Sequence, residues 1–326
     1  MKENPVRALA TWVLRQSRFV SLDEEGLQKL AEDLRCLPDP EWVSAYHFRG
    51  EEELTLRYLL VLDALNFCFW PPLFFDFAHH GRGPQSGGKW NILGPNGERL
   101  TGYYALSFRL RQLAEDFPDF FSPSFLGRVS LKELWELLGP IPLPSWRVRA
   151  LHEVGAVLTH FGSASRFFSL AKNSGQKLVE LLTAHLPMFR DAALYLGRWI
   201  PFYKRAQILV ADLWGTFGGK GFGEFYDLEW LTAFADYKLP QILWDRGAIR
   251  LVPSLARRIL ARELIPRGSE EEVELRAAAV VAVEELVGLL RERGREILPF
   301  QVDWLLWNLS QEGLSVPHHC TLTWAY

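Results

Sequence analysis

The chain has 326 residues, of which 48% are hydrophobic, so it can bury a large core and is not an intrinsically disordered protein. Its formal net charge of −3 and sequence pI of about 6.3 argue against a broad surface for duplex nucleic acid, which normally carries an excess of basic residues. A small anionic ligand remains compatible with this charge.

Cysteine usage and hydropathy predict a cytoplasmic protein. Cys36, Cys68 and Cys320 are far apart and form no Cys-x-x-Cys pair, which suits a reducing compartment and excludes a disulfide scaffold or a zinc ribbon. The first residues lack an apolar signal core, and acidic residues, an asparagine and prolines interrupt the most hydrophobic run, residues 59–77. We therefore expect neither secretion nor insertion into a membrane.

Apolar residues recur with helical spacing along most of the chain, so we expect a mainly α-helical protein. No linker marks a domain boundary, and residues 1–326 are expected to form one domain, which allows two tightly packed helical lobes. Ser21 and Ser130 each begin a segment with the spacing of a capping box. The predicted helices span residues 5–19, 23–36, 51–70, 103–115, 148–161, 174–185, 188–196, 201–214, 254–263, 269–293 and 299–309.

Residues 79–102 are the least helical part of the chain, because they contain seven glycines and two prolines. Two short runs flank a turn at residues 94–97 and predict a small β-hairpin near residues 89–101. This segment is expected to be either a flap over a binding site or a surface element.

The end of the predicted helix 51–70 combines polar and aromatic residues. Asp63, Asn66 and Trp70 would share one helix face at i, i+3 and i+7. In one interpretation, Asn66 is a buried and hydrogen-bonded side chain within an aromatic core. In the other, this region is a pocket wall that stacks a heterocycle on Phe67, Phe69 or Trp70.

Lys204, Asp212 and Asp236 are charged residues within otherwise core-like sequence. Burying a charge without a partner costs several kcal/mol, so such residues are usually paired or functional. On a helix, Asp212 would lie about 80° around the axis from Lys204 and about 12 Å along it. We therefore expect Lys204 and Asp212 to contact different neighbours.

Asp236 precedes a predicted helix in which Pro240 fits the first turn. A helix cap is a sufficient explanation for this aspartate, and such a cap is worth about 1 kcal/mol. The same geometry also suits catalysis, because a carboxylate held by helix N-terminal amides can face a developing cation. Spacing alone favours the cap.

Five segments, in order along the chain, resemble the queuosine salvage proteins, which are queuosine 5′-phosphate N-glycosidases. The three strongest are residues 202–212 (FYKRAQILVAD), 234–241 (FADYKLPQ) and 65–70 (LNFCFW). Weaker matches are residues 101–104 (TGYY) and 303–307 (DWLLW). Five separated segments in the family's order are far more specific than any one of them.

The resemblance implies release of queuine and ribose 5-phosphate from queuosine 5′-monophosphate. Asp236 would then face C1′ of the ribose, and Lys204 would pair with the 5′-phosphate or polarise the site around the sugar. Asp303 would accept hydrogen bonds from the guanine-like edge of the base, and Asp212 would support the site. Other implied contacts with substrate are Asn66, Phe67, Phe69, Trp70, Tyr103, Tyr104, Tyr237, Trp307 and His319.

The chain differs from the family, and from the helix-hairpin-helix DNA glycosylases, at two places. In the family a histidine near the C-terminus is followed by basic residues, whereas here Cys320 follows His319. A lysine in one helix and an aspartate heading a later helix resemble the helix-hairpin-helix DNA glycosylases, and we expect a related fold. Residues 199–203 before Lys204 lack the glycines with which those enzymes grip DNA.

No other motif in the sequence indicates a phosphate loop, a metal site or a serine nucleophile. The glycine-rich residues 218–223 follow a helix and lack the Gly-Lys-Ser/Thr ending of a phosphate loop. The His pairs 79–80 and 318–319 have no metal-binding spacing, and no Gly-x-Ser-x-Gly elbow is present. We expect no metal, no cofactor and no stable complex with nucleic acid. Two alternatives stay open, a nucleic-acid base glycosylase and a non-catalytic protein that binds a modified base.

Overall fold

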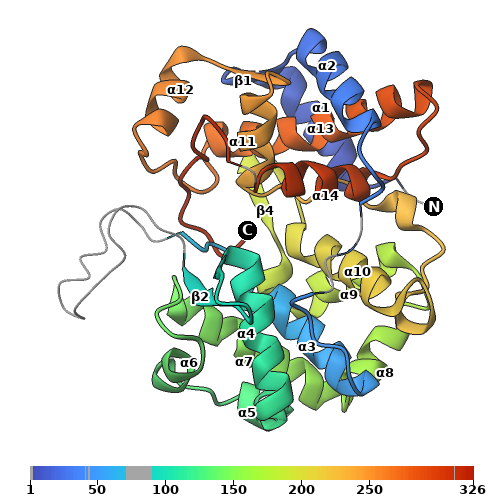
Figure 1. Cartoon of the computed structure of the whole chain (residues 1–326), viewed down its shortest axis with the longest axis vertical. Helices are drawn as coiled ribbons and strands as arrows, with labels where there is room; N and C mark the ends of the chain where they lie inside the picture. Colours follow the sequence, from blue (N-terminus) through green and yellow to red (C-terminus); the bar gives the residue numbers. More distant parts are fainter. Residues whose placement is uncertain (1–2, 41, 43–44, 71–89, 312) are drawn as a thin grey trace.

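Helices dominate the chain, as the apolar spacing predicts. The computed structural model describes residues 3–40, 42, 45–70, 90–311 and 313–326 (Figure 1). Among these residues, no helix is both long and apolar enough to cross a membrane. The α-helices are α1 (Pro5–Gln16), α2 (Glu24–Arg35), α3 (Glu52–Leu65), α4 (Gly102–Asp116), α5 (Pro123–Leu126), α6 (Leu131–Leu138), α7 (Pro144–Phe161), α8 (Ala164–Ser169), α9 (Gly175–His185), α10 (Lys204–Phe217), α11 (Lys238–Asp245), α12 (Pro253–Leu260), α13 (Glu270–Glu292) and α14 (Pro299–Leu309).

The strands form small two-stranded antiparallel sheets. They are β1 (Val20–Leu22) with β6 (Ile249–Leu251), β2 (Asn91–Leu93) with β3 (Arg99–Thr101), and β4 (Ala192–Tyr195) with β5 (Arg198–Pro201). The β2–β3 pair, in which Ile92 lies opposite Leu100, confirms the hairpin predicted near residues 89–101. Residues 79–89, on which the prediction of a flap or a surface element partly rests, lie outside the described residues.

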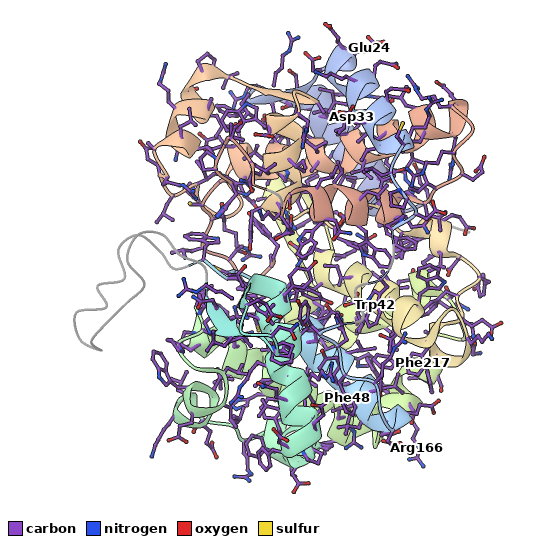
Figure 2. The ribbon with its side chains drawn as sticks, viewed as in Figure 1. Glu24, Asp33, Trp42, Phe48, Arg166 and Phe217 are labelled. Atoms are coloured by element: carbon purple, nitrogen blue, oxygen red, sulfur yellow. The ribbon has the colours of Figure 1, made fainter. Side chains whose placement is uncertain are left out.

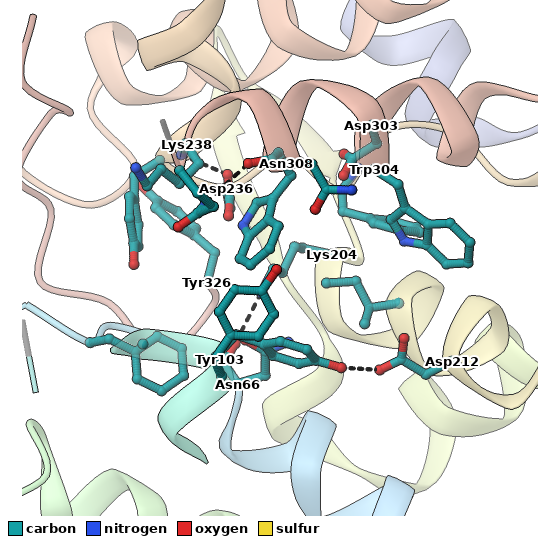
Figure 3. A pocket seen from close by; sticks show the side chains of 18 of the residues that line it. Asn66, Tyr103, Lys204, Asp212, Asp236, Lys238, Asp303, Trp304, Asn308 and Tyr326 are labelled. Carbon is teal, nitrogen blue, oxygen red and sulfur yellow. Dashed lines mark hydrogen bonds between the residues drawn. The ribbon is translucent and has the colours of Figure 1, made fainter. Parts of the chain in front are cut away.

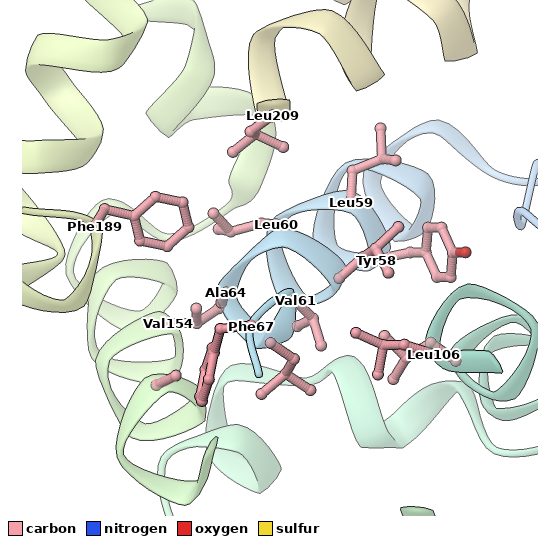
Figure 4. Packing of buried hydrophobic residues seen from close by; sticks show 14 of the residues in the cluster. Tyr58, Leu59, Leu60, Val61, Ala64, Phe67, Leu106, Val154, Phe189 and Leu209 are labelled. Atoms are coloured by element: carbon pink, nitrogen blue, oxygen red, sulfur yellow. The ribbon is translucent and has the colours of Figure 1, made fainter. Parts of the chain in front are cut away.

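Buried apolar side chains form two cores. The first core lies among α3, α4, α7, α9 and α10, and Figure 4 shows its part around α3, where Tyr58, Leu60 and Phe67 are buried. The second core surrounds α13, which packs against α1, α2, α11 and α14. The helices of the two cores occupy the lower and upper halves of Figure 1, and side chains project from both into the region between them (Figure 2). Tyr203 packs against both cores.

Helix α3 ends at Leu65, so the prediction of a helix to residue 70 is wrong. The guanidinium of Arg147, on α7, donates hydrogen bonds to the backbone carbonyls of Leu65, Phe67 and Cys68. Cys68 also has a positive φ of 41°, which a continuing helix does not allow. The buried cation thus binds the last carbonyl of α3 and two carbonyls of the segment that follows it, and the chain turns away from the helix axis.

The helix predicted at residues 188–196 is also absent. A short 3-10 turn, Pro187–Phe189, precedes the β4–β5 hairpin. The hairpin turns at Leu196 and Gly197, whose φ angles are 45° and 78°, as a two-residue turn with left-handed residues requires. Pro201 ends β5, opposite Ala192, and is not the first turn of α10, which begins at Lys204.

The two predicted capping boxes have different outcomes. At α6 the box is present, because Ser130 and Glu133 each accept the other's backbone N–H. At α2 the prediction is wrong, because Ser21 belongs to β1 and pairs with Arg250 of β6. Asp23 caps α2 by accepting the N–H of Gly26 at 2.8 Å.

Candidate active site

A cavity lies between the two cores, with α14 and α11 on one side and α4 and α10 on the other (Figure 3). It encloses about 940 Å³, counting the space at its open mouth, which suits a ligand of nucleotide size. The residues that line it are Trp42, His47, Asn66, Phe69, Thr101, Gly102, Tyr103, Tyr104, Lys204, Ile208, Asp212, Phe234, Asp236, Tyr237, Lys238, Asp303, Trp304, Trp307, Asn308, Gln311 and Tyr326.

Asp236 lines this cavity at the head of α11. Its Oδ1 accepts the backbone N–H groups of Lys238 at 2.7 Å and of Leu239 at 3.1 Å, which are the predicted capping bonds. Among the residues that the structure describes, no side chain or amide donates to Oδ2. The helix amides therefore fix the carboxylate through one oxygen and leave the other for a ligand.

Lys204 is the first residue of α10, and only 4% of its surface is exposed. Its Nζ donates to the backbone carbonyl of Asn66 at 3.1 Å. Burial lowers the pKa of the ammonium to about 8, although the charges of Asp236 and Asp63 raise it. Within the described part of the chain, the hydrogen-bond partner of Nζ is this neutral carbonyl, so the cation can still pair with an anionic ligand.

A buried ion pair links the turn before Lys204 to the segment before Asp236. Arg276 of α13 binds both carboxylate oxygens of Asp191 and donates from Nε to the carbonyl of Ala235 at 2.9 Å. Asp191 in turn accepts the backbone N–H of Lys204 on its Oδ2 at 3.3 Å. One guanidinium therefore positions the backbone beside both residues that we expect to be catalytic.

Asp212 lies on α10, at another side of the cavity. Its Oδ2 accepts the hydroxyl of Tyr103 at 2.6 Å and its Oδ1 accepts Nε1 of Trp42 at 3.0 Å. The Tyr103 hydroxyl is also 2.9 Å from Nε2 of His47. Burial raises the pKa of Asp212 to about 6, although these two hydrogen bonds and the charge of Lys204 lower it. Lys204 and Asp212 thus bond different neighbours, as their helical angle predicts, yet they line the same cavity.

Asp303 of α14 contributes a third carboxyl group. Its Oδ2 accepts the backbone N–H of Phe234 at 2.7 Å. Burial, and next the negative charge of Asp236, raise the pKa of Asp303 well above its usual value. One turn further on, the ring of Trp307 meets Tyr104 edge to face at 5.1 Å between centroids, so aromatic rings wall the space below this carboxyl group.

The structure brings most of the predicted site residues together around the cavity. These are Asn66, Phe69, Tyr103, Tyr104, Lys204, Asp212, Asp236, Tyr237, Asp303 and Trp307. Phe67, Trp70 and His319 do not line it. The guanidinium groups of Arg147 and Arg205 lie 4.3 and 5.1 Å from the ring of Phe67, which belongs to the first core.

Trp70 and His319 lie behind the wall of the cavity. The Trp70 ring packs on His318 at 6.0 Å between centroids. His319 is within 3.1 Å of the hydroxyl of Tyr326, and burial lowers its pKa to about 3, so its ring is neutral at pH 7. A neutral histidine behind Tyr326 does not act as a cationic phosphate contact.

Several lining residues were missed by the sequence reasoning. Lys238 could have been found by the criterion that identified Lys204, because it also interrupts an apolar run. Asn308 follows Trp307 at the end of α14, and Gln311 lies just beyond that helix. Trp42 and His47 follow no helical pattern, and nothing in their spacing indicates a site.

The described residues contain no group of three His, Cys, Asp or Glu side chains placed to hold a metal ion. The cavity presents carboxylates, ammonium groups and aromatic rings. Of the His pairs weighed in the sequence, residues 79–80 lie outside the described residues. His318 is buried and contacts the carbonyl of His319 through Nδ1.

Comparisons with known proteins agree with the sequence resemblance. A family model described as "Queuosine salvage protein" matches residues 46–326. Three relatives carry the name "Queuosine 5'-phosphate N-glycosylase/hydrolase". The protein from Sphaerobacter thermophilus is 39% identical over 96% of this chain and 95% of its own length. Those from Dictyostelium discoideum and Mus musculus are 36% and 33% identical, over 98% and 97% of this chain and 98% and 96% of their own lengths. The chain therefore belongs to the queuosine salvage protein family.

Proposed function

We propose that this protein is an N-glycosidase that hydrolyses queuosine 5′-phosphate to queuine and ribose 5-phosphate. The observation that carries the proposal is the carboxylate of Asp236, fixed by two helix amides at the edge of a cavity that also contains the ammonium of Lys204. The names of the relatives supply the substrate. Release of queuine would serve the salvage of a modified tRNA base, and a cytoplasmic location stays a prediction.

The proposed reaction breaks the bond between C1′ and the base nitrogen, and the electron pair leaves with the base. The ribose then carries positive charge as an oxocarbenium-like species. The free Oδ2 of Asp236 stabilises this charge, and the carboxylate accepts a proton from the water that forms the new C1′–O bond. That proton then passes to the nitrogen of the departed base, so queuine is released with a neutral ring and Asp236 is ionised again. The described chain has a fixed anion at this point, so little reorganisation is needed as the charge develops.

The departing base needs contacts of its own. Queuine is a 7-deazaguanine and lacks N7, so it cannot be activated by protonation there. Asp303 would accept hydrogen bonds from the N1–H and the 2-amino group of the base. These donors favour the ionised carboxylate, and substrate binding would therefore lower the pKa of Asp303, which burial raises. Tyr104 and Trp307 would pack against the ring.

Replacing Lys204 with methionine is expected to raise KM for queuosine 5′-phosphate about 10- to 100-fold and to change KM for the free nucleoside much less. The reason is that the ammonium pairs with the phosphate, which the nucleoside lacks. Lys29→Met, on the exposed face of α2, is the control and should leave both constants unchanged. Equal effects of Lys204→Met on both substrates would exclude a contact with the phosphate.

The same lysine predicts a pH dependence. Because burial lowers the pKa of Lys204 to about 8, the ammonium is charged below that pH and loses its proton above it. We expect kcat/KM for the phosphorylated substrate to fall about tenfold per pH unit above about pH 8. Rates measured with the wild type and with Lys204→Met check this, since the variant should show no such decline.

We also propose a fold relation to helix-hairpin-helix DNA glycosylases. The support is the order of the elements: the β4–β5 hairpin, then α10 with Lys204 at its start, then Asp236 at the head of α11. The charge of the chain does not favour a duplex substrate.

One experiment distinguishes the nucleotide glycosidase from a nucleic-acid base glycosylase and from a non-catalytic binding protein. The protein is incubated with queuosine 5′-phosphate and with a duplex that contains a modified base, and the products are separated by chromatography. We expect free queuine from the nucleotide and no base from the duplex. If neither substrate released a base, the non-catalytic binding protein would be the remaining alternative.

A further inference from the structure

Asp212 is a buried carboxylate whose hydrogen-bond donors are both neutral. Only 3% of its surface is exposed, and its hydrogen bonds come from a phenol and an indole. Among the residues that the structure describes, no lysine or arginine forms a direct ion pair with it, and the ammonium of Lys204 lowers its pKa only as a more distant charge. A buried carboxylate without a directly paired cation costs several kcal/mol, so a cationic ligand group at this place would relieve that cost.

The position of Asp212 matches one particular side of the substrate. Figure 3 shows Asp303 and Asp212 approaching the cavity from different helices, with Asp236 on the far side from Asp212. In a 7-deazaguanine, C7 lies on the opposite edge from N1 and the 2-amino group. If C1′ faces Asp236 and the guanine-like edge meets Asp303, the substituent on C7 points toward Asp212.

The C7 substituent of queuosine begins with an aminomethyl group, whose secondary amine is protonated at neutral pH. We propose that Asp212 binds this ammonium and thereby selects nucleotides that carry a cationic arm on C7. The inference rests on the proposed function and adds to it the residue that recognises the aminomethyl substituent on C7. Lys204 and Asp236 would act equally on any 7-deazaguanine nucleotide, whereas Asp212 would discriminate between them.

The local geometry supports this role. A carboxylate offers about four lone-pair directions, and Tyr103 and Trp42 use one on each oxygen. The two neutral donors hold the group in place, and their bonds leave acceptor capacity for the N–H groups of an ammonium. With a pKa of about 6, Asp212 is mostly ionised at neutral pH before the substrate arrives.

The test compares two substrates that differ in one charge. These are the 5′-phosphates of 7-aminomethyl- and 7-hydroxymethyl-7-deazaguanosine, which have arms of similar size. We expect the wild type to prefer the cationic substrate at least about tenfold in kcat/KM, and Asp212→Asn to reduce the preference to about twofold or less. Asp33→Asn, on the exposed face of α2 far from Trp42 in Figure 2, should keep the wild-type preference.

The outcomes separate this inference from the proposed function. Equal rates of the wild type on both nucleotides, or an unchanged preference in a folded Asp212→Asn variant, would overturn the role of Asp212 while leaving the glycosidase intact. Release of no base from either nucleotide or from queuosine 5′-phosphate would overturn the proposed function, and this inference with it. The absence of a wild-type preference would overturn the inference even if the variant did not fold.

Discussion

The variant Asp236→Asn is expected to lose about 10³-fold or more in kcat for queuine release while keeping its fold and its affinity for the substrate. The amide oxygen of asparagine can still accept the N–H groups of Lys238 and Leu239, so the cap survives. The negative charge that would stabilise the ribose cation is lost. Single-turnover chromatography of the products, together with equilibrium binding of the substrate, measures the two effects separately.

Asp23→Asn provides a matched control. Asp23 also accepts a backbone N–H at the start of a helix, but it lies on α2 and pairs with Arg250 instead of lining the cavity. This variant should keep wild-type turnover. If Asp236→Asn turned over like the control, Asp236 would be a helix cap and nothing more.

The variant Arg276→Met is expected to lower the free energy of unfolding by about 3–5 kcal/mol. Arg276 is 2% exposed, it binds Asp191 through two nitrogens, and Glu272 lies 3.6 Å away. Its removal would leave two buried carboxyl groups without their cation. Urea unfolding of the variant and the wild type measures this loss.

The control for Arg276→Met is the same change at Arg258, whose partners Glu263 and Glu271 are more accessible to water. That variant should lose no more than about 1 kcal/mol. Adding Asp191→Asn to Arg276→Met should restore part of the stability, because one uncompensated charge is then removed. A loss below about 1 kcal/mol for Arg276→Met would show that the buried pair does not stabilise the fold.

Arg276→Met also tests how the site is held together. Its guanidinium supports the carbonyl of Ala235, next to Asp236, and the aspartate that accepts the N–H of Lys204. Activity measured at a temperature where the variant is fully folded should therefore fall as well. An unchanged kcat in the folded variant would mean that other contacts position the two residues.

Local signals predict much of the fold. The helix from residue 299 to 309 and the hairpin at residues 91–101 follow from apolar spacing, proline and turn residues, and both are confirmed. The end of α3 does not follow from local signals, because it depends on Arg147, which is remote in sequence. Likewise, the apolar run at residues 188–196 reads as a helix until the turn at Leu196 and Gly197 is considered.

The site was predicted where a charged residue interrupts an apolar run. Lys204, Asp212 and Asp236 stand out in this way, and the structure brings all three to one cavity. The residues that support them do not stand out. Asp191 and Arg276 are 85 positions apart, and only the folded chain shows that they form a buried pair. Likewise, helical spacing placed Trp70 beside Asn66, but the early end of α3 turns it toward His318.

The most direct test of the account is the isotope effect of deuterium at C1′ of queuosine 5′-phosphate. The bonds to C1′ become planar as the ribose cation forms, so the wild-type protein should release queuine more slowly from the deuterated nucleotide, with a rate ratio clearly above one. A ratio of one under conditions in which bond cleavage limits the rate, or the absence of queuine with either substrate, would contradict the account.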